Sequence, residues 1–167
     1  PGYRIYTTDS SFGAVLVAEF AGGSGREEDP YLVANADQLY NVRNHLDKHF
    51  KLIEDIDLSG YSTGKGWEPI GDERTPFTGA FDGDGHTISN LFIKRPVDPF
   101  IGLFANSGLD AKIRNVGLIN VNVTGYNHVG GLAGRNRGQV TNSYATGNVT
   151  GEAETGGLVG ENGGPIA

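Results

Sequence analysis

A repeated motif near the end of the chain constrains the fold more than any other feature. The segment Gly130-Gly-Leu-Ala-Gly-Arg-Asn136 returns as Gly156-Gly-Leu-Val-Gly-Glu-Asn162, so the interval from Gly130 to Gly156 is 26 residues. A period of about 20 to 50 residues is typical of solenoids and arrays, in which each repeat packs on its neighbours. The sequence therefore predicts a repeat protein, and it says more about fold than about chemistry.

Two further alignments extend the repeat. One aligns the tripeptides that end at Asn90, Asn115 and Asn142, at intervals of 25 and 27 residues. The other aligns residues 120–125 with residues 146–151. Such coils contain only short apolar runs and leave no room for a helix in each repeat, whereas parallel strands stacked about 4.8 Å apart fit well. We therefore predict an all-β fold, a right-handed parallel β-helix of about four coils.

Asparagine at a recurring corner of such a coil has a physical role. Its side chain tolerates the left-handed backbone conformation and can hydrogen-bond to the matching side chain of the next coil. We expect Asn90, Asn115 and Asn142 to form one such ladder.

The N-terminal part of the chain lacks the repeat. Residues 3–8 and 13–20 are β-branched and aromatic runs separated by Asp9-Ser-Ser, which predicts a hairpin. In residues 51–60, Leu52, Ile56 and Leu58 share one face, with Glu54 as the exception, which predicts the first strand of the solenoid.

Between these runs, an apolar stripe predicts one helix. The stripe consists of Leu39, Val42, Leu46 and Phe50, and Asn35 or Asp37 can cap the first turn. We expect a helix over about residues 36–49 that covers the first coil, because the end of a solenoid must be shielded from water and from edge pairing.

These features suggest three regions. Residues 1–24 form the hairpin and a linker, residues 25–60 form the capping segment with its helix and first strand, and residues 61–167 form the coils. A further repeat begins near the last residues, and we expect the coils of the parent protein to continue beyond this chain.

The repeat resembles a known motif. Gly-Gly-Leu-(Ala/Val)-Gly-x-Asn, followed by Asn142-Ser-Tyr-Ala-Thr-Gly-Asn-Val-Thr-Gly151, is similar to the GLUG motif of bacterial surface and secreted proteins. These proteins include large adhesins and the non-catalytic regions of some IgA-cleaving metallopeptidases. The resemblance covers about residues 25–167 and departs at Asp84, where the usual turn has Asn. It implies a β-helix that is extracellular or at the bacterial cell surface, and it implies no particular activity.

Composition and charge limit the classes of molecule that this chain could bind. The net charge is −7 with a pI near 5.0 and no basic patch, which argues against nucleic acid. No run approaches about 18 apolar residues, so we expect no membrane insertion. The chain has no cysteine, which excludes disulfides and cysteine-based metal sites within it. A glycan or a protein of a host or cell surface remains as a partner.

Three carboxylates are the candidates for chemistry. Asp82 and Asp84 lie two residues apart in Phe-Asp-Gly-Asp-Gly, and Glu68 follows Trp67. Paired carboxylates can act as acid and base on a sugar, and they can also bind calcium. Asp-Gly pairs also form ordinary turns, so a structural role is the alternative.

Other side chains are candidates for binding. His45 and His49 have the i, i+4 spacing of a zinc pair on a helix but lack the usual intervening Glu, so packing is the simpler interpretation. Trp67 could contact a sugar, and Arg135 and Arg137 fall at a predicted corner, where a solenoid would meet a partner.

The sequence favours a non-enzymatic surface module that acts as an adhesin segment, binding module or spacer. A polysaccharide lyase or hydrolase built on a β-helix and an accessory domain of a secreted peptidase are the alternatives. Calcium is the one cofactor that the residues allow. Function is expected where the repeat is interrupted, in residues 61–76 and 94–101 or beside Arg135 and Arg137.

Overall fold

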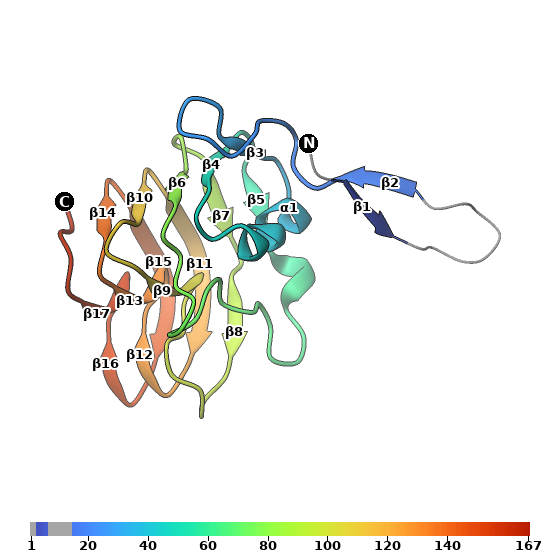
Figure 1. Ribbon diagram of the computed structural model, residues 1–167. Helices are drawn as coiled ribbons and strands as arrows, with labels where there is room; N and C mark the ends of the chain where they lie inside the picture. Colours follow the sequence, from blue (N-terminus) through green and yellow to red (C-terminus); the bar gives the residue numbers. More distant parts are fainter. Residues whose placement is uncertain (1–2, 7–14) are drawn as a thin grey trace.

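The computed structural model describes residues 3–6 and 15–167 and shows a β-solenoid of about four coils (Figure 1). Apart from an N-terminal hairpin, its sheets are parallel, as the repeat predicted. The right-handed sense of the coil stays a prediction. No helix within the described ranges is long and apolar enough to cross a membrane.

One side of the solenoid is a five-stranded parallel sheet, here called the β6 sheet. Its strands, in spatial order, are β14 (Gln139–Thr141), β10 (Lys112–Arg114), β6 (Ala80–Asp82), β4 (His49–Leu52) and β3 (Tyr31–Val33). Neighbouring strands of this sheet come from successive turns of the chain around the solenoid axis.

Two other sheets complete the coil. The β11 sheet contains β15 (Tyr144–Thr150), β11 (Gly117–Thr124), β7 (Thr87–Ser89) and β5 (Ile56–Asp57), and β8 (Phe92–Lys94) also pairs with β11. The β13 sheet contains β17 (Val159–Asn162), β13 (Ala133–Asn136) and β9 (Phe104–Ser107). A short pair joins β12 (Asn127–Val129) to β16 (Ala153–Thr155).

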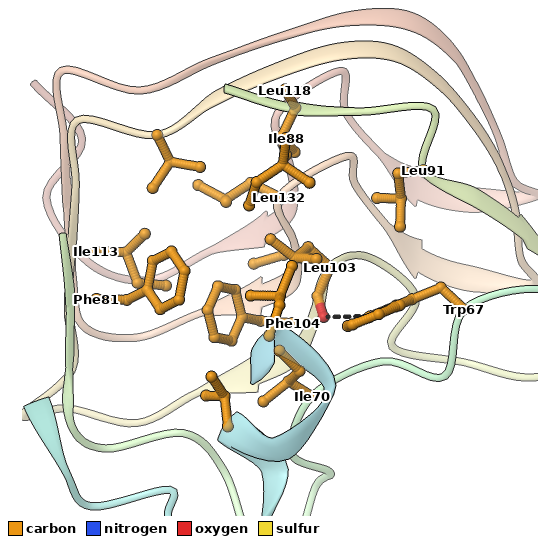
Figure 2. Close-up of a cluster of buried hydrophobic side chains, with 14 of the residues drawn as sticks. Trp67, Ile70, Phe81, Ile88, Leu91, Leu103, Phe104, Ile113, Leu118 and Leu132 are labelled. Atoms are coloured by element: carbon orange, nitrogen blue, oxygen red, sulfur yellow. Dashed lines mark hydrogen bonds between the residues drawn. The ribbon is translucent and has the colours of Figure 1, made fainter. Parts of the chain in front are cut away.

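Inward side chains stack into columns because the strands pair in register. Phe50, Phe81, Ile113 and Val140 form one column, and each of these side chains is at most 1% exposed. Figure 2 shows the interior, in which Ile88 and Leu118 lie beside Leu132, and Phe104 and Ile113 lie around Phe81. Continuous apolar columns of this kind give adjacent coils a shared core.

The capping helix exists but is shorter than predicted. Helix α1 spans Ala36–Asn41 and continues as the 3₁₀ turn η1 (Val42–Asn44). The predicted cap is correct at Asn35, whose Oδ1 accepts from the Gln38 NH over 3.0 Å, while Gln38 Oε1 accepts from the Ala34 NH. The prediction of a helix to residue 49 was wrong, because His49 begins strand β4.

The predicted first strand is also divided. Residues 51–60 were expected to form one strand, but β4 ends at Leu52 and β5 spans only Ile56–Asp57, with a corner between them. At the N-terminus, β1 (Tyr3–Tyr6) and β2 (Val15–Ala18) pair antiparallel, as the predicted hairpin requires. The turn expected at Asp9-Ser-Ser lies outside the described residues.

The expected asparagine ladder is two ladders at two corners. Asn142 Nδ2 donates to Asn115 Oδ1 over 3.4 Å, as predicted. Asn90 is not in this ladder, because β7 pairs with β11 and places Asn90 beside Asn120. In the coil beneath, Asn115 Nδ2 donates to Asp82 Oδ1 over 2.8 Å, although strand pairing aligns Asp82 with Arg114.

Candidate functional site

The outer face of the β6 sheet carries a partly open hollow of about 210 Å³, here called the Ala80 cleft. Strand pairing builds it, because His49, Ala80 and Lys112 occupy one outward row across β4, β6 and β10. Lys51, Asp82 and Arg114 occupy the next row. The methyl side chain of Ala80 leaves a gap between longer neighbours, and this gap is the floor of the cleft.

Asp82 lies in the wall of the cleft as part of an ion pair. Its Oδ2 accepts from Nε and Nη2 of Arg114, each over 2.8 Å, and its Oδ1 accepts from Asn115 Nδ2 and from the Asp84 NH. Partial burial opposes ionisation, but these hydrogen bonds and the Arg114 charge outweigh it and lower the pKa of Asp82. Asp82 is therefore a carboxylate at neutral pH, and it cannot donate a proton as a general acid there.

Asp84 lies next to Asp82 but has a different partner. It occupies a turn with a φ of 50°, and its Oδ2 lies 2.9 Å from Nζ of Lys51. The two aspartates therefore bind cations of different coils, Lys51 below and Arg114 above. These two ion pairs connect three successive coils.

Glu68 belongs to another hollow. Its Oε2 accepts from the Tyr40 hydroxyl over 2.9 Å and lies 3.2 Å from Nη1 of Arg43. Two adjoining hollows of about 180 and 270 Å³ share Glu68, Pro69 and Gly71 in their walls. Glu68 thus faces this groove, whereas Asp82 faces the Ala80 cleft, so the three candidate carboxylates do not converge on one site.

Trp67 does not offer a surface for a sugar. Its side chain is 0% exposed, and its Nε1 points to the Leu103 carbonyl oxygen at 3.4 Å (Figure 2). The Tyr40 and Tyr61 rings pack edge-on against it. The prediction of a binding role was wrong because the side chain points into the solenoid and fills the core.

The two candidate arginines, Arg135 and Arg137, differ in their exposure to solvent. Arg135 lies within β13 rather than at a corner, and its side chain is only 13% exposed. Its Nε donates to Glu161 over 2.6 Å, and its guanidinium lies 4.4 Å from the centre of the Phe100 ring. Arg137 follows β13 and is exposed. Arg135 therefore joins coils, and Arg137 alone keeps the accessible position that was predicted for both.

The two histidines are not a helical pair. His45 follows η1, and its Nε2 lies 3.0 Å from Glu19, whereas His49 is in β4 and lines the Ala80 cleft. Within residues 3–6 and 15–167, no three His, Asp or Glu side chains come together as a metal site. Calcium at Asp82 and Asp84 would have to displace Lys51 and Arg114.

The cations of the Ala80 cleft did not stand out from the sequence. Lys51, Lys112 and Arg114 are scattered over more than 60 residues and form no run. The sequence does carry a signal for their outward orientation, because each of these cations is adjacent to a buried apolar residue of its strand. Only the correct pairing of β4, β6 and β10 brings them together.

Comparison with known proteins places the repeat in a motif class. Residues 125–150 match the GLUG motif. The chain is 41% identical over 147 residues to a "Putative Gly-rich membrane protein" of Evansella cellulosilytica, covering 84% of this chain and 17% of that protein. It is 39% identical over 155 residues to "Halomucin" of Haloquadratum walsbyi, covering 86% of this chain and 2% of that protein.

A solved structure has the same fold. It is the crystal structure of a "putative immunoglobulin A1 protease" from Bacteroides ovatus, with a TM-score of 0.50 and 22% identity, covering 89% of this chain and 67% of that chain. The chain is thus a β-solenoid that contains a GLUG motif at residues 125–150, and it spans a small part of the two long relatives that it matches.

Proposed function

We propose that this chain is a non-enzymatic β-helix module of a cell-surface or secreted protein, in which it serves as a rigid spacer that presents a binding face. One observation carries the proposal: the acidic residues that could perform chemistry are bound to cations of neighbouring coils. Asp82 pairs with Arg114, Asp84 pairs with Lys51, and Glu68 pairs with Arg43.

The distribution of these carboxylates argues against hydrolysis or elimination on a sugar. Such reactions need an acid and a base on either side of one bond, and the acid must hold a proton at neutral pH. Asp82 has a lowered pKa, and Glu68 faces a separate groove. The same groups do explain cohesion between coils, which is what a spacer requires.

The surface location of the proposal rests on the relatives. One of them is named a membrane protein and another halomucin, and the matched segment is a small part of each. A module repeated within long surface proteins suits a chain whose corners and faces are polar and whose interior is continuous. An antibody raised against this module should label intact cells of the source organism, and labelling only after permeabilisation would contradict the surface location.

A cleavage assay tests the non-enzymatic claim. Purified protein is incubated with a panel of neutral and acidic polysaccharides, and new reducing ends and unsaturated sugars are measured. We expect no product above a heat-inactivated control. Product that forms with the wild-type protein and disappears in Asp82→Asn or Glu68→Gln would overturn the proposal.

A further inference from the structure

We infer that the Ala80 cleft is a binding site for a carboxylated sugar, such as a uronic acid unit of an acidic polysaccharide. The inference rests on the proposed function in that it names the ligand of the binding face. Three observations carry it: the shape of the cleft, the cations around it and the absence of a free strand edge beside it.

The shape comes from one small residue in a row of long ones. Ala80 lies between His49 on β4 and Lys112 on β10, and all three point outward. Because adjacent strands are about 4.8 Å apart, the two flanking side chains start roughly 10 Å from each other. That separation admits one sugar ring above the Ala80 methyl group, held between two nitrogen-bearing side chains.

The charges of the cleft suit one carboxylate. Lys51 and Arg114 are already paired with Asp84 and Asp82. Lys112 is exposed and has no ion pair within the described part of the chain, which leaves its ammonium group for a ligand. An ammonium group binds a carboxylate through a charge-assisted hydrogen bond.

The other groups of the cleft suit hydroxyls. Glu27 presents carboxylate oxygens that can accept hydrogen bonds from sugar hydroxyl groups. Asp82 also borders the cleft, but both of its oxygens already accept from Arg114, Asn115 and the Asp84 NH. Arg114 and His49 provide nitrogen atoms beside them. A second negative group on the ligand would meet Glu27 and Asp82, so the cleft favours one carboxylate among several hydroxyls over a densely charged polyanion.

The sheet pairing argues against an extended peptide. A peptide strand binds by pairing its backbone with an open sheet edge. The strands beneath the cleft have no open edge, because β6 lies between β4 and β10, and β4 lies between β3 and β6. A ligand here meets only side chains, which is the usual way in which a polyhydroxylated sugar is held.

Titration calorimetry tests this inference with three probes. These are an oligosaccharide of galacturonic acid, the neutral galactose oligosaccharide of the same length and an oligoglutamate peptide. We expect heat of binding only with the galacturonate probe, with an affinity that falls as salt is added. Binding of the peptide with equal affinity, or of no probe at all, would overturn the inference.

Variants locate the site. Lys112→Gln removes one charge-assisted bond and should weaken binding of the galacturonate probe roughly tenfold. Ala80→Leu fills the cleft and should abolish binding. The control Lys94→Gln changes an exposed lysine of β8 and should bind as the wild-type protein does. Unchanged binding in Lys112→Gln, which alters only an exposed side chain, would also overturn the inference.

The same mixtures separate this inference from the proposed function. Sugar products are measured after each titration. Cleavage of the probe would contradict the non-enzymatic module whether or not the cleft variants bind. Absence of binding without cleavage contradicts only the carboxylated sugar site.

Discussion

Asn120 and Asn90 lie one above the other at the same corner of adjacent coils, and Nδ2 of Asn120 donates to Oδ1 of Asn90 over 2.7 Å. Both residues have a positive φ, 57° and 59°, which asparagine tolerates better than most side chains. Asn90 in turn donates to Asp57 Oδ1 over 2.9 Å. The corner is thus a column of polar side chains that joins three coils outside the apolar core.

The Asp82 ion pair should stabilise the fold in a pH-dependent way. Asp82→Ala leaves Arg114 and Asn115 without their acceptor, so we expect the free energy of unfolding at neutral pH to fall by about 1–3 kcal/mol. Because the folded pKa of Asp82 is lowered, its contribution is present above the unfolded pKa of about 4 and is lost as pH falls through the folded pKa.

Urea unfolding of both proteins at neutral pH and well below pH 4 measures this contribution. The difference between wild type and Asp82→Ala should shrink at acid pH. Asp110→Ala, at an exposed position, is the matched control and should have little effect. A difference that stays constant with pH would contradict an ionised role for Asp82.

Asn136 should matter more than a surface asparagine of the same repeat. It is 0% exposed, its Oδ1 accepts from Ser107 Oγ, and its Nδ2 donates to Asn162 Oδ1 and the Gly138 carbonyl oxygen. Asn136→Ala leaves buried polar groups unpaired, which costs about 1–3 kcal/mol. Thermal unfolding should show the loss, whereas Asn148→Ala on exposed β15 should melt near the wild-type temperature. Equal melting of the two variants would refute the role of this buried ladder.

The two glycines of the motif should differ in their tolerance of a side chain. A Cβ at Gly130 would overlap the Ala133 carbonyl oxygen, whereas a Cβ at Gly157 would meet nothing within 4 Å. We expect Gly130→Ala to cost more than about 2 kcal/mol and Gly157→Ala to stay within about 0.5 kcal/mol of wild type. Denaturant midpoints measure both, and a tolerated Gly130→Ala would contradict the close packing of these coils.

Calcium should not change the stability of the module. The carboxylates proposed to bind it, Asp82 and Asp84, already pair with Arg114 and Lys51. Melting temperatures measured with added calcium and with a chelator should agree. A rise with calcium that disappears in Asp84→Asn would establish a site that displaces Lys51.

The sequence predicted best where successive coils have equal length. Val121, Asn122 and Val123 pair with Gly147, Asn148 and Val149, as the 26-residue interval required. The alignment failed at Asn90, because earlier coils contain residues 61–76 and 94–101. Phe81 pairs with Ile113, an interval of 32 residues, so a search for intervals near 26 selected the wrong corner.

The end of the helix was missed for a different reason. Phe50 fits both a helical stripe with Leu46 and a strand that alternates from His49 to Leu52. Pairing of β4 with β3 and β6 decides between the two patterns, and such long-range pairing is invisible in a local window. The same limit applies to Trp67, since an ordered loop and a core position look alike until the coils are stacked.

The central claim is that the coils stack in the register that places Asn120 above Asn90. Because the chain has no native cysteine, paired cysteines test it directly. Residues paired across adjacent strands lie within the Cα separation that a disulfide spans. Under mild oxidation Asn90→Cys with Asn120→Cys should cross-link within one chain, and Asn90→Cys with Asn115→Cys should not. Cross-linking of the second pair in place of the first would contradict the register and the account built on it.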